Sequence, residues 1–180
     1  MEFLQNLDIN ILDFIQNNMK NPIIDNIMVL ITSLGNVGLL WIAISLYLIF
    51  INKDKKTGYR MLFSLLLCFI IGNLFLKNLV ARTRPFDINT NMQILINRPL
   101  DYSFPSGHTM TSFAAAIVLF HKNKKFGLIA IILASLIAFS RLYLYVHYPT
   151  DVLFGLLIGI AIGEITIYVA NRLKNKGCKS

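Results

Sequence analysis

A histidine and an aspartate stand at a junction between two apolar stretches of the chain. The segment Ser140–Asp151 reads SRLYLYVHYPTD and separates these stretches. His147 and Asp151 are four residues apart, so on a helix they share one face and the carboxylate can accept a hydrogen bond from the imidazole. The other ring nitrogen then keeps a free lone pair, which suits a nucleophile or a base. The alternative is a helix start, at which Asp151 only caps the helix after Pro149.

A second histidine follows a run of small residues in the segment Phe104–Thr109, which reads FPSGHT. A helix that starts with small residues exposes backbone N–H groups that bind anions, here at Gly107 and beyond. The hydroxyl of Ser106 adds a further donor, and His108 would stand beside the bound anion. The alternative is an ordinary helix cap, since serine and glycine are both common at that position.

Three cations accompany these two segments. Lys77 and Arg84 belong to a third polar segment, KNLVARTRP, and Arg141 directly follows an apolar run. The planar guanidinium suits phosphate oxygens. The alternative is that the cations anchor to lipid headgroups, and we prefer it for Arg82 and Arg98. It fits Arg141 poorly, because a charge beside a membrane span is costly unless it is paired.

Together these side chains form the set that phosphoryl transfer requires. The reaction needs a nucleophile in line with phosphorus and positive charge around three equatorial oxygens. Because the cations supply that charge, we expect no metal and no other cofactor. His108, His147 and Asp151 could ligate zinc by residue type, but three nearby cations would repel a divalent ion.

The elements that position these residues are predicted to be membrane helices. The 180-residue chain is 56% hydrophobic and 14% charged, and its mean hydropathy is +0.62. This composition is typical of a membrane protein. The uncharged runs show no alternation of period two, which favours helices over strands. Five runs are candidate spans: Ile27–Ile51, Met61–Leu76, Tyr102–Phe120, Phe126–Ser140 and Val152–Ala170.

The sequence therefore predicts an all-α, polytopic membrane helical bundle with five transmembrane helices. Gly35–Asn36 interrupts the first run, so a break is expected there, and a sixth span results if residues 27–34 insert separately. Residues 1–20 show apolar side chains at helical spacing and predict an amphipathic helix on the membrane surface. Pro22 then suits the first turn of another helix. We expect interfacial helices over residues 1–36, the bundle over residues 37–173 and a basic cytoplasmic tail over residues 174–180.

The basic residues are distributed unevenly between the two ends of the predicted spans. Eleven of the 17 Lys and Arg residues lie in residues 52–60, residues 121–125 and the C-terminal tail, which share one side if five spans alternate. By the positive-inside rule this side is cytoplasmic. The clustering explains the net charge of +8 without a nucleic-acid partner. His108, His147 and Asp151 then belong to the extracytoplasmic side of a multi-pass cell-membrane protein.

The three polar segments resemble the signature of the type 2 phosphatidic acid phosphatase family, which also contains haloperoxidase relatives. Its first motif is a lysine, six residues and Arg-Pro, which Lys77 and Arg84-Pro85 match. Its second motif is Pro-Ser-Gly-His, which residues 105–108 match. Its third is Ser-Arg, five residues, His, three residues and Asp, which residues 140–151 match.

The resemblance implies a role for each matched residue. His147 would attack phosphorus and form a phosphohistidine, with Asp151 orienting its ring. His108 would protonate the leaving oxygen and then help to activate water. The phosphate-binding residues would be Lys77, Arg84, Ser106, Gly107 and Arg141.

The resemblance also implies a substrate class, a lipid phosphate or pyrophosphate hydrolysed at the outer leaflet. With an outward-facing site, it favours undecaprenyl pyrophosphate. Phosphatidylglycerophosphate or phosphatidic acid is the alternative substrate. A non-enzymatic lipid or anion transporter is a more remote alternative, because apart from Glu164 the inner halves of the predicted spans lack polar residues.

Two features of the fifth run lie outside the predicted site. Glu164 is about 20 Å along the helix from Asp151, at about 1.5 Å per residue. That is too far for direct chemistry, so we expect Glu164 to be structural. A carboxylate buried at a helix centre is costly, so we expect it either to have a partner or to be protonated. Gly155, Gly159 and Gly163 recur every four residues, which predicts close approach of a neighbouring helix. Cys68 and Cys178 are expected to form neither a disulfide nor a metal site.

Overall fold

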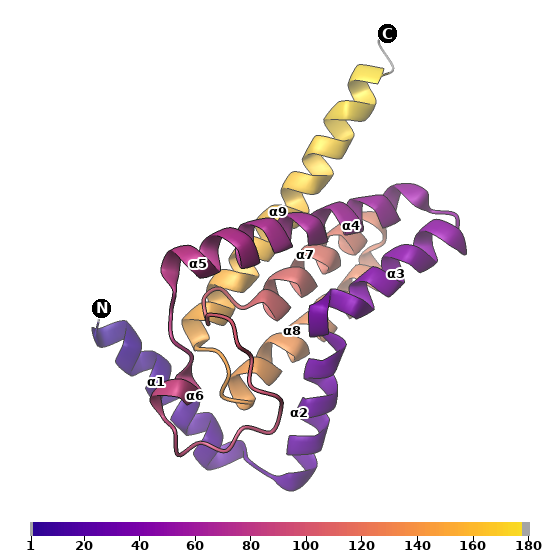
Figure 1. The fold of residues 1–180 in the computed structure, drawn as a ribbon. Coiled ribbons are helices and arrows are strands. Elements are labelled where there is room, and N and C mark those ends of the chain that lie inside the picture. The colour runs from indigo at the N-terminus through magenta and orange to yellow at the C-terminus, as the bar shows by residue number, and fades with distance from the viewer. Residues whose placement is uncertain (1, 178–180) are drawn as a thin grey trace.

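The computed structural model describes residues 2–177, and every regular element in that range is helical (Figure 1). Cys178 and the end of the predicted basic tail lie outside this range. The elements follow one another in the order α1 (Glu2–Met19), α2 (Pro22–Leu34), η1 (Asn36–Gly38), α3 (Leu39–Phe50), α4 (Lys55–Cys68), η2 (Phe69–Leu76), α5 (Lys77–Val80), α6 (Pro85–Ile88), α7 (Gly107–Lys122), α8 (Lys124–Tyr143) and α9 (Pro149–Gly177).

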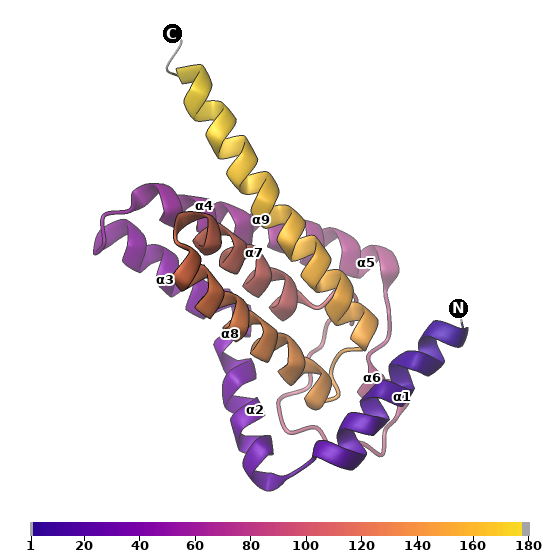
Figure 2. The same ribbon diagram turned by 180° about the vertical axis from the view of Figure 1, so that it is seen from behind.

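Helix α7 runs through the middle of the bundle and packs against α9, α8 and α4 (Figure 2). Three consecutive small side chains, those of Ala114, Ala115 and Ala116, are fully buried, which lets the neighbouring helices come close. The indole N–H of Trp41 on α3 donates to the hydroxyl of Ser112 at 2.9 Å and ties α3 to this centre. The helices that carry the polar segments are therefore all positioned against α7.

The close packing predicted for the glycines of α9 is confirmed. Gly155, Gly159 and Gly163 all face α7, and a Cβ atom added to Gly159 would lie 2.4 Å from the carbonyl oxygen of Met110. That oxygen belongs to the backbone of α7, so it could give way only if the helix itself moved. The distance between α7 and α9 thus depends on the missing side chain at residue 159.

The N-terminal helices form as the sequence predicts. Helix α1 buries Leu12 and Ile15 against the protein and leaves Phe3 exposed, along with other apolar residues of the same face. Helix α2 starts at Pro22, and the side chain of Asn21 caps it by accepting from the backbone of the second helical residue at 2.8 Å. That α1 lies on the membrane surface stays a prediction.

The predicted break in the first apolar run is also confirmed. Helix α2 and the helix that follows it are bent by 43° at Gly35. Val37 and Gly38 both have positive φ angles, 52° and 68°, which redirect the chain between the two helices. Residues 35–38 of the break line a cavity, with Gly35 and Gly38 buried and Val37 exposed.

The number of spans is smaller than predicted when length and composition are applied to the described residues. Three helical segments qualify, Lys55–Ile88, Lys124–Tyr143 and Pro149–Leu173, and the bent pair Pro22–Leu34 and Asn36–Phe50 makes a fourth if it counts as one span. Helix α7 has 16 residues, which is short for a bilayer crossing. The prediction of five or six spans is therefore not confirmed.

The connections rich in basic residues gather at one end of the bundle. The ammonium group of Lys122, at the end of α7, lies 2.7 Å from the carboxylate of Asp54, just before α4. Arg60 of α4 donates to the side chain of Asn171 of α9 at 3.0 Å. In Figures 1 and 2 this end lies opposite α6 and the loop that precedes α7.

Glu164 has the partner that the sequence predicted. Its carboxylate lies 2.9 Å from Nε2 of His121 at the end of α7. The side chain is half exposed, at 52%, rather than buried as expected. The pair joins α7 to α9 far from the other two histidines.

We predict that Gly159→Ala destabilises the protein. The added methyl group would collide with the backbone of α7, and such overpacking costs about 1–3 kcal/mol of the free energy of unfolding. Thermal or denaturant unfolding of the purified protein in detergent would measure the loss. Ala161→Val is the matched control, because Ala161 is an exposed residue of the same helix. Equal stability of the two variants would contradict the packing argument.

Candidate active site

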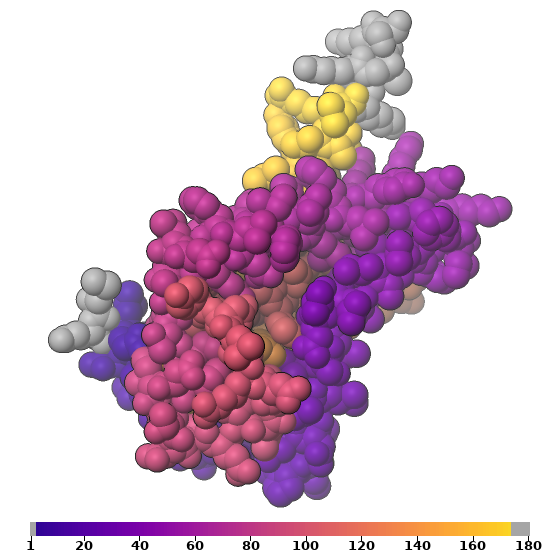
Figure 3. Space-filling model, viewed as in Figure 1, coloured from indigo at the N-terminus to yellow at the C-terminus, as the bar shows by residue number. Residues whose placement is uncertain are grey.

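A cavity of about 1210 Å³ opens between α2, η1, α4 and the loop before α7. Figure 3 shows this face of the molecule hollowed between the same segments. Six of the eight predicted site residues line the cavity, and Ser106 and Asp151 do not. The six are Lys77, Arg84, Gly107, His108, Arg141 and His147.

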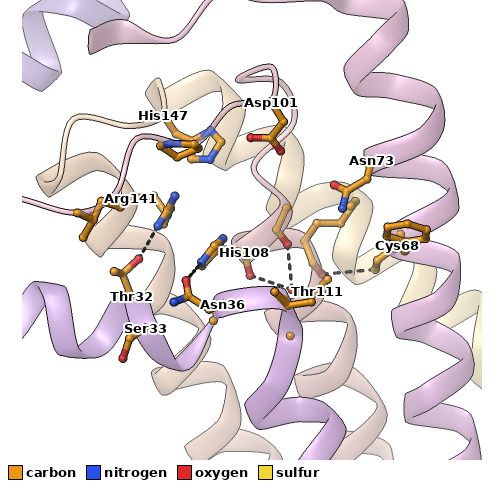
Figure 4. A pocket seen from close by; sticks show the side chains of 18 of the residues that line it. Thr32, Ser33, Asn36, Cys68, Asn73, Asp101, His108, Thr111, Arg141 and His147 are labelled. Carbon is orange, nitrogen blue, oxygen red and sulfur yellow. Dashed lines mark hydrogen bonds between the residues drawn. The ribbon is translucent and has the colours of Figure 1, made fainter. Parts of the chain in front are cut away.

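His147 lies in the loop between α8 and α9, not on a helix as predicted, because α9 begins only at Pro149. Its ring is buried and lines the cavity together with Arg141 and His108 (Figure 4). Nε2 lies 3.3 Å from Nη1 of Arg84. A guanidinium group can only donate, so Nε2 must accept and the ring proton belongs on Nδ1. Burial, together with the charges of Arg84 and Arg141, lowers the pKa of His147 to about 3 against the opposing effect of Asp151. The ring is therefore neutral, with its lone pair turned toward the cations.

Asp151 stands behind this imidazole. Its Oδ2 atom is 3.7 Å from Nδ1 of His147, which is longer than a hydrogen bond. The carboxylate accepts instead from the hydroxyl of Ser103, from the backbone N–H of Tyr148 at 2.9 Å and from Arg82 at 2.7 Å. The contact with Tyr148 caps the first turn of α9. Asp151 thus combines the two alternatives that the sequence left open, since it caps the helix and also faces the imidazole.

Lys77 and Arg84 meet at one carboxylate, that of Asp101. Nη2 of Arg84 lies 2.6 Å from Oδ1, and the ammonium group of Lys77 contacts Oδ2. The guanidinium also donates to the backbone carbonyls of Asp101 and Val146, at 2.8 and 2.7 Å, which fixes its plane. Both cationic side chains are nearly buried, whereas the Asp101 side chain is 51% exposed.

Arg141 lies in the last turn of α8 and presents an unsatisfied donor at the cavity. Its Nη1 donates to the hydroxyl of Thr32 at 2.6 Å, but its buried Nε has no partner. Among the described residues, only this atom and Nδ1 of His147 are buried side-chain nitrogens or oxygens without a hydrogen bond. Such orphaned groups are rare in folded proteins. Nδ1 of His147 faces Asp151, whereas Nε of Arg141 belongs to a residue that lines the cavity, so this nitrogen indicates a place for a polar acceptor there.

His108 lies in the first turn of α7 and contacts the break after α2. Its Nε2 is 3.1 Å from Oδ1 of Asn36. Gly35 makes this approach possible, because a Cβ atom there would lie 2.6 Å from the imidazole carbon Cδ2. The interruption of the first apolar run therefore positions the second histidine.

The start of α7 places Gly107 and Ser106 differently. Gly107 faces the cavity, where a Cβ atom would lie 4.0 Å from the ammonium nitrogen of Lys77. Ser106 is fully buried, and its hydroxyl accepts from Thr109 at 2.9 Å. Its N–H donates to the carbonyl of Asp151 at 3.0 Å, which joins α7 to α9. Of the two, only Gly107 reaches the cavity wall.

Arg82 does not anchor to headgroups as predicted. Its guanidinium bridges Asp8 of α1 and Asp151, each at 2.7 Å, and lies over the ring of Tyr148. Both carboxylates are almost completely buried. A buried carboxylate requires a charged partner, and this requirement explains why the arginine turns inward. Arg82 thus fastens α1 to the start of α9.

Four residues in or beside the site were not predicted: Thr32, Asn36, Asp101 and Ser103. Asn36 had a signal, since it is a polar residue within an uncharged run of 25 residues. Asp101 had one as well, because it is an acidic residue close to the Pro-Ser-Gly-His motif. Thr32 and Ser103 had none, since hydroxyl side chains are common in apolar helices and in loops.

The cavity also has an apolar lining. It is formed by residues of α2, α3, α4, η2 and the loop before α7, among them Val29, Ile42, Leu62, Leu65, Leu66, Phe69 and Ile96. A single cavity therefore combines buried cations with apolar walls. This arrangement fits a ligand with an anionic head and a hydrocarbon tail.

Comparisons with known proteins agree with this geometry. Residues 57–175 match the family described as the PAP2 superfamily. The chain is 29% identical over 167 residues to an undecaprenyl-diphosphatase of Sulfolobus acidocaldarius, covering 92% of this chain and 80% of that protein. It is 32% identical over 158 residues to the undecaprenyl-diphosphatase BcrC of Bacillus subtilis, covering 86% and 79%.

A solved structure is also similar in fold. The crystal structure of a transmembrane PAP2 type phosphatidylglycerolphosphate phosphatase from Bacillus subtilis superposes with a TM-score of 0.80 at 26% identity. The match covers 96% of this chain and 88% of that one.

We predict that Arg82→Met lowers the free energy of unfolding by about 3 kcal/mol, because it leaves two buried carboxylates unpaired. Unfolding in detergent, followed by circular dichroism, would measure the loss. Arg98→Met is the matched control, since Arg98 is an exposed arginine of the neighbouring loop. If the two variants unfold alike, the bridge between Asp8 and Asp151 does not stabilise the fold.

We predict that His147 stays neutral between about pH 5 and pH 8, because its pKa lies well below the usual 6.5. Below about pH 6.5 the unfolded chain binds a proton at this residue, whereas the folded chain does not until about pH 3. The free energy of unfolding therefore falls as the pH drops from about 6.5 toward 3. Nitrogen-15 NMR of labelled histidine, assigned with His147→Gln, would follow the ring. Titration of His147 with a midpoint near 6.5 would contradict its neutral, buried state.

Proposed function

The chain belongs to the PAP2 superfamily, and from this premise we propose that it is an undecaprenyl-diphosphatase-type lipid phosphatase acting at the extracytoplasmic leaflet. Membership in the family supports a membrane lipid phosphatase as such. The finer proposal is that it hydrolyses undecaprenyl pyrophosphate to undecaprenyl phosphate. Two of the similar proteins carry this activity in their names.

One observation carries the proposal, namely the cavity that joins buried cations and a neutral imidazole to an apolar wall. The cations would bind the terminal phosphate, and Nε of Arg141 would gain the acceptor that it lacks. The apolar wall would receive the first isoprene units of the lipid. A soluble phosphate ester would leave this wall without a contact.

In the first step of the proposed reaction, the Nε2 lone pair of His147 attacks the terminal phosphorus. A phosphorus–nitrogen bond forms as the bond from phosphorus to the bridging oxygen breaks. His108 gives a proton to that oxygen, and the lipid monophosphate leaves. The imidazolium that forms at His147 keeps its Nδ1 proton, which faces Asp151 at 3.7 Å. A small rotation of the ring would close this distance as positive charge develops.

In the second step, water attacks the phosphohistidine. His108, now neutral, takes a proton from the water as the oxygen bonds to phosphorus and the bond to nitrogen breaks. Orthophosphate is released, and the imidazole of His147 is neutral again. The contact between His108 and Asn36 at 3.1 Å would keep the ring oriented through both steps.

We propose that the protein's own cations replace a metal. Lys77, Arg84 and Arg141 approach the same part of the cavity from α5, the turn before α6, and α8. Each can hydrogen-bond an equatorial oxygen, which neutralises the charge on a transferring phosphoryl group. Turnover is accordingly expected to persist in the presence of a chelator.

We further propose five spans, with α7 as the fifth and the bent pair α2–α3 as one. The pairs Lys122–Asp54 and Arg60–Asn171 bring the basic connections to one end, and this end would be cytoplasmic together with the C-terminus. The cavity opens toward the other end. Helix α7 can be shorter than the bilayer because the other helices surround it.

Phosphatidylglycerophosphate is the alternative substrate, since a protein of similar fold is a phosphatidylglycerolphosphate phosphatase. The cationic end of the cavity suits either headgroup. The alternatives differ in the tail, because an isoprenoid is a single branched chain and a glycerolipid has two chains. Comparison of purified turnover therefore separates them.

We predict that the purified wild-type protein hydrolyses a polyprenyl pyrophosphate with a higher kcat/KM than phosphatidylglycerophosphate. His147→Ala should lower this rate by at least about 10³-fold, as expected for loss of a nucleophile. Phosphate release in detergent, with and without chelator, measures both quantities. His121→Ala is the matched control and should keep a near-normal rate, because His121 pairs with Glu164 away from the cavity.

Each outcome of this assay bears on one part of the proposal. Preference for phosphatidylglycerophosphate would replace the substrate. A chelator effect reversed by a divalent metal would overturn the metal-free mechanism. Lipid binding or transfer without phosphate release would favour a transporter.

A further inference from the structure

An acidic side chain already holds two of the cations that the proposed reaction needs. The carboxylate of Asp101 uses one oxygen for Nη2 of Arg84 and the other for the ammonium group of Lys77. Its geometry is that of an anion bound between two cations, as a phosphate would be. The same donors cannot serve a carboxylate and a phosphate at full strength. A dianion placed beside this carboxylate would also be repelled.

We propose that Asp101 is an internal competitor for the phosphate, which occupies Lys77 and Arg84 while the site is empty and is displaced when substrate binds. This inference rests on the proposed function, because it assumes that Lys77 and Arg84 bind the phosphate. It assigns a role to a residue outside the three motifs. Asp101 would lower the affinity for phosphate, whereas the cations raise it.

The position of Asp101 allows displacement. Its side chain is 51% exposed, in contrast to 7% for Lys77 and 3% for Arg84, so the carboxylate can turn into solvent while the cations stay in place. The adjacent Leu100 is fully exposed.

The backbone on the N-terminal side of Asp101 is lightly held. Within the described chain, residues 93–101 make no backbone-to-backbone hydrogen bond. On one side the loop is held by Ile94, Leu95 and Ile96, which pack against a buried cluster. On the other it is held by Ser103, which bonds to Asp151 and to the carbonyl of Arg82. Between these anchors the carbonyl of Asp101 accepts from Nε of Arg84 at 2.8 Å. Residues 97–100 and the Asp101 side chain can therefore move without unfolding either anchor.

The competition does not depend on the protonation of Asp101 near neutral pH. Partial burial raises the pKa of this carboxyl, but the hydrogen bonds and charges of Lys77 and Arg84 lower it to about 2. The group is thus ionised wherever the lipid phosphate is ionised. Exchange between two anions, rather than titration, governs which of them holds the cations.

Asp101 would also promote release of the product orthophosphate. Orthophosphate is a dianion, and Lys77, Arg84 and Arg141 would retain it as a tight product inhibitor. Return of Asp101 to two of these cations favours release. The apparent affinity for a ligand equals the intrinsic affinity multiplied by the fraction of molecules in which the site is free. If Asp101 holds the cations in about nine of ten molecules, orthophosphate binds about tenfold more weakly than it otherwise would.

The experiment compares orthophosphate binding to three forms of the full chain in detergent micelles. These are the wild type, Asp101→Asn and Asp87→Asn. Asp87 is an exposed residue of α6, and its carboxylate makes no hydrogen bond or ion pair with Lys77 or Arg84. Its backbone N–H donates to the carbonyl of Arg84 at 3.1 Å, and Asp87→Asn keeps this bond, so the variant controls for the loss of charge alone. Isothermal titration measures binding without turnover, and inhibition of lipid phosphate hydrolysis measures the same site during turnover.

We expect Asp101→Asn to bind orthophosphate about tenfold more tightly than the wild type, and Asp87→Asn to bind within about twofold of it. Unchanged or weaker binding to Asp101→Asn would overturn the inference alone and would make Asp101 a residue that positions the cations. No binding to any of the three forms would overturn the proposed phosphate site together with the inference.

A crystal structure of the wild-type protein with orthophosphate bound tests the same point without a substitution. The Asp101 carboxylate should then have left Lys77 and Arg84 and turned toward solvent. A carboxylate that still lies between Lys77 and Arg84 beside bound orthophosphate would overturn the inference even if Asp101→Asn fails to fold.

Discussion

The burial of three cationic side chains at one site is the constraint on which the rest of this structure depends. Lys77, Arg84 and Arg141 are all nearly buried at one end of a single cavity. Buried charges are costly unless they are paired and hydrogen-bonded. The protein meets this cost only in part, through backbone carbonyls, the hydroxyl of Thr32 and the one carboxylate of Asp101. The donors that remain without an acceptor, such as Nε of Arg141, are available to a ligand. An anion bound there would stabilise the buried cations.

The fold holds these charges by packing around α7. Gly159 brings α9 against α7, and the carbonyl of Asp151 accepts from Ser106 at the start of α7. The same aspartate caps α9 and faces His147. Through Arg82 it is also connected to α1, so the amphipathic N-terminal helix supports the site from behind. Asp151 is therefore more than the partner of His147, because it also connects α1, α7 and α9 at this end of the bundle.

The sequence predicted the helical membrane class, the break at Gly35–Asn36 and the convergence on one cavity of the cations and both histidines, because apolar runs and motif spacing carry that information. It could not predict which polar residues from other helices complete the site. Thr32 resembles any hydroxyl residue in an apolar helix until the bend of α2 brings it to Arg141. Arg82 was wrongly predicted to contact headgroups, because its partner Asp8 is 74 residues away in the chain. Long-range pairing of this kind has no local signal.

The central claim is that the cations and the His147 imidazole converge on one anion. Anomalous diffraction from crystals soaked with tungstate, a phosphate analogue, tests it most directly. The account predicts one strong peak within hydrogen-bonding distance of Arg84 and Arg141, with Nε2 of His147 in line with the metal atom. A peak elsewhere, or an imidazole turned away from an anion bound at those arginines, would contradict it.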